Sequence, residues 1–162
     1  MRRKSAHPSI PSTLQHPEAC RVAIVRSSYY PELLDSMEEG ARRKFRDAGI
    51  PDAHIKTQIV PGSFEIPLAC ASIIEKKKVH GIVALGVIIE GETHHAAEIA
   101  RACTDGLMQV QLNKNIPIAH GVLFVKSLEQ AMERAREDHN RGTEAAEALL
   151  RMLAALEIHV QP

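Results

Sequence analysis

The sequence has few cysteines, no net charge and no long apolar run, and each shortage excludes a class of protein. The three cysteines, Cys20, Cys70 and Cys103, lie far apart and form no C-x-x-C pair, which argues against a disulfide framework and a zinc ribbon and favours buried apolar thiols. Lys+Arg and Asp+Glu both number 20, so no overall basic field attracts nucleic acid or an anionic membrane. No apolar run approaches membrane-spanning length. Any anion site must therefore be local.

The first 19 residues differ in composition from the rest. They contain two arginines, a lysine and prolines at 8, 11 and 17, without the apolar stretch of a secretory signal. We predict a disordered tail over 1–19, with an organellar transit peptide as the alternative. Because 162 residues suffice for one core and are few for two, we expect 20–162 to form a single domain of a cytoplasmic protein.

Short apolar runs alternate with helical patterns along this domain. The runs of strand length are 20–25, 55–60, 81–89 and 116–125. The helical patterns cover about 31–48, 67–78, 91–115, 127–138 and 142–156. This order predicts an α/β protein with a three-layer, flavodoxin-like fold, in which helices flank both faces of a four-stranded parallel sheet. The uninterrupted run 81–89 is expected to be a central strand, because both of its faces must be covered.

Ligands of such sheets gather outside the carboxyl ends of the strands, so chemistry is expected in four segments. These segments are 26–30, 61–65, 88–95 and 124–127. In the second of them, Pro61-Gly62 allows a close approach of a ligand to the backbone, although composition alone favours a plain turn. In the first segment, Tyr29-Tyr30 can stack on a planar ligand, or these tyrosines can be half-buried residues at the end of a strand.

The segment Gly91-Glu92-Thr93-His94-His95 opens a long helix, whose unpaired amide N–H groups favour a phosphate. Adjacent helical residues point roughly 100° apart, so only one of the two histidines can face a site. A general acid/base histidine fits this position because imidazole titrates near neutrality. His94 with Glu98 has spacing suited to a metal, but no third ligand is evident.

Arg134 lies on the fourth helical pattern. Taken alone, its position predicts a solvated helix face on which Arg134 and Asp138 form an i,i+4 pair.

Four segments taken together resemble the lumazine synthase family: PGSFEIP, LGVIIEGETHH, GVLFVKSLEQAMERA and NRGTEAAEALL. They follow one another in the family's order and spacing and extend over about residues 20 to 158. The resemblance implies condensation of 5-amino-6-(D-ribitylamino)uracil with 3,4-dihydroxy-2-butanone 4-phosphate, the penultimate step of riboflavin biosynthesis, without cofactor or metal. It also implies small-molecule substrates and a homo-oligomer built of pentamers, with no nucleic-acid or membrane partner.

Matching motifs assign a role to each site residue. For the pyrimidine and its ribityl chain they imply stacking on Tyr29, a pocket lined by Ser63, Phe64 and Glu65, and contacts from Val87, Ile88, Ile89 and His120. For the butanone phosphate they imply Glu92, Thr93 and the phosphate-binding Arg134, with His95 as the proton-transfer residue and His94 as a bystander.

Three departures from the family pattern stand out. Ser28-Tyr29-Tyr30 replaces Arg-Phe-Asn, and His120 replaces a bulky Phe or Trp. The segment from Arg134 to Gly142 is one residue shorter than usual, with Arg141 in the position of a lysine, and this segment influences assembly. The sequence leaves a pentamer, a decamer and an icosahedral shell as alternatives.

Two rival functions share this fold. One is a non-catalytic lumazine- or flavin-binding or shell protein, which the presence of both His95 and Arg134 argues against. The other is an FMN electron carrier, for which RSSYYPE is a poor hydroxyl-rich phosphate loop.

Overall fold

The computed structural model describes residues 13–76 and 78–156. Most of the predicted tail, residues 1–12, lies outside the described residues. Of the remainder, Leu14 packs into the core and Pro17–Ala19 forms the short 3-10 helix η1.

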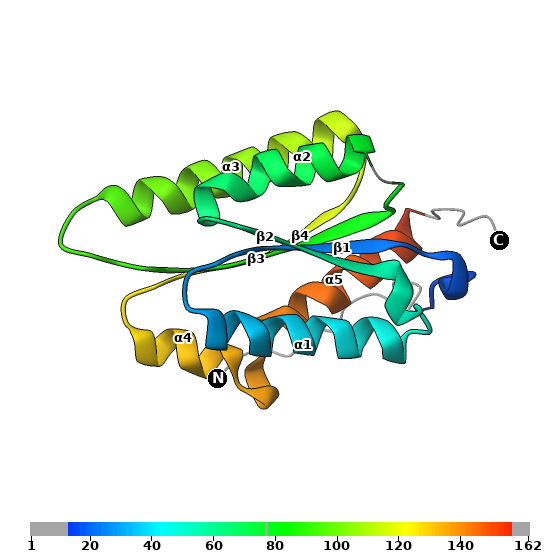
Figure 1. Ribbon diagram of the computed structural model, residues 1–162, viewed down its shortest axis with the longest axis horizontal. Coiled ribbons are helices and arrows are strands. Elements are labelled where there is room, and N and C mark those ends of the chain that lie inside the picture. The colour runs from blue at the N-terminus through cyan, green and yellow to red at the C-terminus, as the bar shows by residue number, and fades with distance from the viewer. Residues whose placement is uncertain (1–12, 77, 157–162) are drawn as a thin grey trace.

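A single sheet of four parallel strands runs through the molecule, in the order β2-β1-β3-β4 (Figure 1). The strands are β1 (Val22–Ser27), β2 (Ile55–Val60), β3 (Gly81–Ile89) and β4 (Ile118–Val125). The predicted parallel sheet is confirmed, and so is the central position of 81–89. Eight of the nine residues of β3 are buried, as a strand covered on both faces requires.

Helices cover both faces of the sheet, which confirms the three layers (Figure 1). One face carries α1 (Pro31–Asp47), α4 (Leu128–Ala135) and α5 (Arg141–Ala155), and the other carries α2 (Ile66–Lys76) and α3 (His95–Lys114). Three further 3-10 turns connect these elements: η2 (Asp52–His54), η3 (Ser63–Glu65) and η4 (Glu137–His139). Each face has its own apolar cluster, because alternate residues of each strand point to opposite sides. Within the described residues, no helix is both long and apolar enough to cross a bilayer.

The sheet has a step at its carboxyl edge. The pairs Ser27↔Val60 and Arg26↔Leu85 are the last of β1 with its two neighbours, whereas β3 and β4 remain paired as far as Ile89↔Val125. The last four residues of β3 therefore extend about 13 Å beyond its pairing with β1. The step gives the loops after β1 and β2 a wall formed by the end of β3.

Two helix boundaries differ from the prediction. The long helix α3 begins at His95 rather than near Gly91. The helix predicted to reach Asp138 ends at Ala135, because the amide of buried Asn140 and the hydroxyl of Ser36 both donate to the carbonyl oxygen of Ala135, at 3.0 Å and 2.7 Å. Arg136 then leaves the helix in an extended conformation, with ψ at 155°.

The three cysteines are buried and unpaired, as predicted. Burial raises the pKa of Cys20 and of Cys70 to about 12, and that of Cys103 to about 11. They behave as small apolar side chains rather than as nucleophiles.

Candidate active site

The loops after β1 and β2 meet at the carboxyl edge. The hydroxyl of Ser28 donates to the carbonyl oxygen of Pro61 at 2.8 Å, which ties the two loops together. A Cβ placed on Gly62 would lie 3.0 Å from Oε2 of Glu65 and 3.7 Å from Cε2 of Tyr29. The carboxylate and the aromatic ring therefore converge over this glycine, and the predicted contacts from the two loops do lie together.

The turn η3 lies against β3. A Cβ on Gly86 would lie 2.5 Å from the hydroxyl of buried Ser63, so the absence of a side chain at Gly86 lets this turn approach the strand. Phe64, the next residue, is 57% exposed, and Tyr29 is 65% exposed. Two large rings in a chain with only two tyrosines and three phenylalanines thus remain uncovered at this edge. We call Tyr29, 63–65 and 87–89 the strand-end half.

A buried arginine holds the first loop in position. Arg26 is 9% exposed, and its guanidinium lies 2.7 Å from Asp35 and 3.0 Å from Glu38, both on α1. Glu38 also pairs with Arg42 at 3.0 Å. A buried pair of this kind is weak evidence for stability, but it fixes where α1 begins relative to β1 and hence the turn that carries Tyr29.

The end of β3 leads into the amino end of α3. Glu92, Thr93, His94 and His95 are exposed, and no side chain caps the first amide groups of α3. This arrangement leaves those N–H groups available to an anion. In the described part of the chain, no group of three or more His, Cys, Asp or Glu residues could hold a metal. The carboxylate of Glu98, the candidate partner of His94, instead pairs with Arg101 at 2.9 Å.

Arg134 belongs to a different group of charges. It pairs with Glu144 at 2.7 Å, and Arg141 pairs with the same carboxylate oxygen at 3.1 Å. Arg141 also donates to the carbonyl oxygen of His120 at 2.8 Å. We call His120, Arg134, Arg141 and Glu144 the helix cluster. The predicted pair of Arg134 with Asp138 is wrong, because α4 ends before Asp138.

Sequence reasoning gave Glu144 no role and noted Arg141 only as a departure from the family. The signal available for both was the start of α5, where the side chain of Asn140 accepts from the amide N–H of Thr143 at 3.1 Å. A helix that begins there places Arg141 and Glu144 at i,i+3 on one face.

His120 lies well away from the carboxyl edge. It pairs with Ala84 in the register of the sheet, whereas β4 ends five residues later at Val125, about 17 Å along the strand. Its ring nitrogen Nε2 lies 2.9 Å from the hydroxyl of Thr104 on α3. Burial, followed by the positive charge of Arg141, holds the pKa of His120 below its ordinary value.

The helix cluster is built around β4, an edge strand on which both α4 and α5 pack. Its residues come from β4, α4 and α5, whereas the strand-end half and His95 come from the ends of β1, β2 and β3. Among the described residues, no hydrogen bond or ion pair joins the two groups. One chain therefore brings the predicted site residues together as two separate groups.

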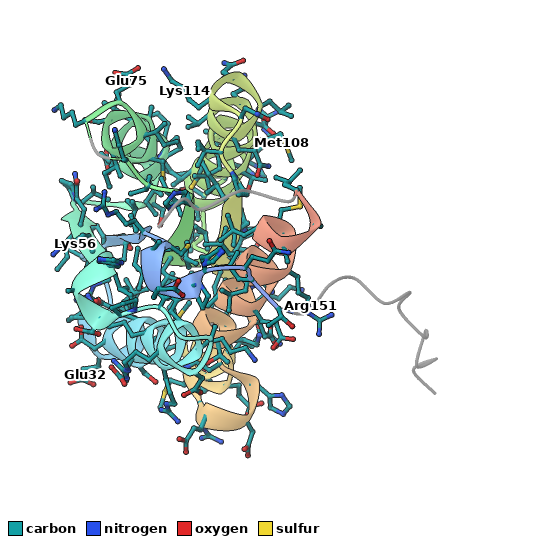
Figure 2. All side chains as sticks on the ribbon, turned by 90° about the vertical axis from the view of Figure 1, so that its right-hand side faces the viewer. Glu32, Lys56, Glu75, Met108, Lys114 and Arg151 are labelled. Carbon is teal, nitrogen blue, oxygen red and sulfur yellow. The ribbon has the colours of Figure 1, made fainter. Side chains whose placement is uncertain are left out.

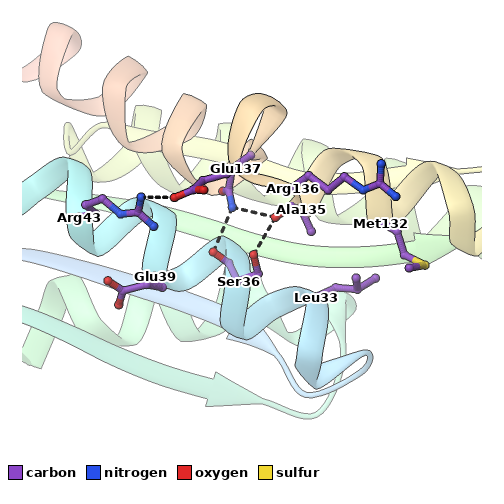
Figure 3. A pocket seen from close by; sticks show the side chains of 9 residues that line it. Leu33, Ser36, Glu39, Arg43, Met132, Ala135, Arg136 and Glu137 are labelled. Atoms are coloured by element: carbon purple, nitrogen blue, oxygen red, sulfur yellow. Dashed lines mark hydrogen bonds and ion pairs between the residues drawn. The ribbon is translucent and has the colours of Figure 1, made fainter.

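A hollow of about 440 Å³ between α1 and the end of α4 belongs to neither group (Figure 3). Its polar lining is satisfied internally, since Arg43 pairs with Glu137 at 2.7 Å and Ser36 donates to the carbonyl oxygen of Ala135. None of the predicted site residues lines it. Volume alone therefore does not mark the site.

Comparison with known proteins shows extensive similarity to one family. Residues 19–157 match the family model for 6,7-dimethyl-8-ribityllumazine synthase. The protein of that name from Stenotrophomonas maltophilia (strain K279a) is 39% identical over 145 residues, covering 89% of this chain and 94% of the relative. The Halorhodospira halophila (strain DSM 244 / SL1) protein of the same name is 37% identical, covering 82% and 86%. The one from Xanthomonas euvesicatoria pv. vesicatoria (strain 85-10) is 36% identical, covering 88% and 93%.

Proposed function

The chain belongs to the 6,7-dimethyl-8-ribityllumazine synthase family, and we propose that it condenses 5-amino-6-(D-ribitylamino)uracil with 3,4-dihydroxy-2-butanone 4-phosphate to give 6,7-dimethyl-8-ribityllumazine. The observation that carries the proposal is the match over residues 19–157, since every residue of both site groups falls within it. The chain is thus a transferase of riboflavin biosynthesis.

The strand-end half suits the pyrimidine substrate. Tyr29 and Phe64 offer exposed ring faces for a planar heterocycle, and Glu65 offers a carboxylate beside them for its N–H groups. The buried ends of β3, Val87 and Ile88, supply the apolar wall of the step. This combination of an apolar wall and a few polar groups is typical of small-molecule sites.

The phosphate of the second substrate suits the amino end of α3, with Glu92 and Thr93 beside it and Arg134 as its cationic partner. Within the chain, Glu144 neutralises part of the positive charge of the helix cluster. Two arginines against one carboxylate still leave a net positive charge for a departing phosphate.

The proposed reaction begins when the substrate ketone and the pyrimidine amine form an imine and release water. Phosphate is then eliminated, and the ribitylamino nitrogen attacks the remaining carbonyl and closes the second ring with loss of a second water. Holding the two substrates in register supplies the largest contribution, on the order of 7–11 kcal/mol. His95, at the first position of α3, transfers protons and adds about 10²–10⁴-fold.

We propose that neighbouring subunits complete one another's sites. Among the described residues no hydrogen bond or ion pair joins the two groups, and the helix cluster includes a residue of the edge strand β4. In a ring, Arg134 of one subunit would reach the strand-end half and His95 of the next, by a heterologous contact that closes with five copies. A pentamer, or a multiple of it, is therefore part of the proposal.

Activity is tested directly with the two substrates. We expect lumazine absorbance and phosphate release to rise together in equal amounts. A purified protein that binds lumazine or flavin but releases no phosphate would instead favour the non-catalytic alternative.

The shared site is tested by refolding His95→Ala and Arg134→Ala chains together. About a quarter of the heterologous interfaces should then carry an intact site, so activity should rise well above that of either parent. Native mass spectrometry should show mixed rings and count their subunits. Mixed rings with only parental activity would mean that both residues serve one subunit's site. The cytoplasmic location stays a prediction, to be tested by fractionation of the native cells.

A further inference from the structure

A second hollow lies at the amino edge of the sheet, opposite the strand-end half. Its volume is about 190 Å³, and its lining comes from the starts of three neighbouring strands and the turn before β2: Arg21, Val22, Ala53, His54, Lys56, Lys78 and Val79. Figure 2 faces this side of the molecule and labels Lys56. We call it the amino-edge hollow.

The charged side chains that line the amino-edge hollow are all basic. It includes three cationic side chains and one imidazole, and no carboxylate. The acidic residue next to it in sequence, Asp52, pairs with Arg42 and Arg46, at 3.3 Å in each case. In a chain with equal numbers of acidic and basic residues, such a concentration of one sign is a local feature.

Arg21 differs from the other arginines in the described part of the chain. Nine of those ten form an ion pair with a carboxylate, and Arg21 is the tenth. Over the same residues, Lys56 and Lys78 form no ion pair either. Three cations that converge on one hollow repel one another, and an anion between them would remove that repulsion.

Hydrogen bonds within the chain fix the backbone around the hollow. The amide of Arg21 donates to Nδ1 of His80 at 2.9 Å, and the amide of His80 donates to the carbonyl oxygen of Arg21 at 2.8 Å. Nδ1 of His54 lies 3.2 Å from the carbonyl oxygen of Cys20. The starts of β1 and β3 and the turn η2 are thereby held together, which lowers the ordering cost of binding.

We propose that the amino-edge hollow binds a compact anion of the phosphate class, such as inorganic phosphate or pyrophosphate, at a site separate from the catalytic one. Its volume is that of about six water molecules, which is enough for a phosphate or pyrophosphate. A competing explanation is that the carboxyl-terminal dipole of α2, which ends at Lys76, is sufficient to hold the cations without a ligand.

Calorimetric titration with pyrophosphate at low ionic strength tests the proposal by stoichiometry. The assembled wild-type protein should bind two anions per subunit, one at the amino-edge hollow and one at the proposed catalytic site. Arg134→Gln should retain the first and lose the second. The double variant Arg21→Gln/Lys56→Gln should show the reverse, with at least a tenfold loss of affinity at the hollow and unchanged turnover. Both sets of changes combined should bind none.

The matched control is Lys44→Gln/Arg151→Gln, which removes the same charge from two residues that both pair with Glu147 on the α1–α5 side. It should bind like the wild type. An equal loss of anion affinity in this control would show that only the overall charge of the protein matters, and would overturn the proposal. The absence of any anion binding in Arg134→Gln would also overturn it. Repeating the titration with inorganic phosphate distinguishes the two anions. Anion binding at the hollow is measured in the Arg134→Gln variant, so the result does not depend on whether the protein has the proposed enzymatic activity.

Discussion

The strand-end half and the helix cluster are built in opposite ways. The first consists of two loops, one 3-10 turn and the end of β3, held by the hydrogen bond of Ser28 to Pro61 and by the close approach of Ser63 to Gly86, and it leaves two aromatic rings exposed. The second consists of three charged side chains on α4 and α5 that pair with one another, together with His120 of β4. The comparison indicates that one region offers shape to a planar substrate and the other offers charge to a phosphate. The two should respond separately to mutation.

The largest effect is expected for Gly142→Ala, which disturbs the packing of α5, the helix that carries Arg141 and Glu144, against α1. A Cβ at Gly142 would lie 1.8 Å from the backbone oxygen of Met37, so α5 cannot keep its contact with α1. We expect the free energy of unfolding to fall by about 3 kcal/mol, measured in urea at fixed subunit concentration. Affinity for the pyrimidine should change less than affinity for the phosphate substrate.

Gly91→Ala is the matched control, because nothing lies within 4 Å of a Cβ at that position. Its stability should match the wild type. Equal losses of both affinities in Gly142→Ala would show that the two regions are not independent.

The next effect is expected for His95→Gln at the start of α3. We expect kcat to fall about 10²-fold and turnover to remain measurable, because positioning outweighs proton transfer. His94→Gln, one residue earlier and outside the helix, should be much milder. Steady-state kinetics of the two variants test this expectation. A greater loss of kcat in His94→Gln would reverse the assignment of the two histidines.

A smaller effect is expected for Arg134→Gln in the helix cluster. Loss of a charge-assisted contact should raise the apparent KM for the butanone phosphate roughly 10- to 30-fold and leave pyrimidine affinity nearly unchanged. Arg151→Gln, which removes an exposed pair with Glu147 from α5, is the control and should be silent. Unchanged kinetics in Arg134→Gln would indicate that Arg134 belongs to a solvated helix face and does not bind the substrate.

The smallest effect concerns His120 and pH. Burial and then the charge of Arg141 lower its folded-state pKa, so below about pH 6.5 the unfolded chain binds the proton more readily than the folded one. Stability is therefore complete above that pH and is lost as the pH falls. His120→Phe should reduce this loss between pH 7.5 and pH 5.5 in urea titrations. Part should remain, because the pKa of His80 is also lowered by burial. An identical pH dependence in the variant would contradict the assignment.

Much of the fold could be predicted from periodicity. The run 55–60 matches β2 residue for residue, and 81–89 is central because it is apolar on both faces. Periodicity did not predict the end of a helix where that end depends on side chains from other parts of the chain. The end of α4 depends on Asn140 and Ser36, and Ser36 lies 99 residues from Ala135.

The sequence by itself determined the order of the elements, the parallel sheet and the family, because local periodicity and short motifs carry this information. The tertiary structure decided how the candidate site residues are grouped. Nothing in the spacing of Arg134 indicates Glu144 as its partner, or His120 as a neighbour of Arg141. Only the packing of α4 and α5 on each other and on the edge strand β4 brings these residues together.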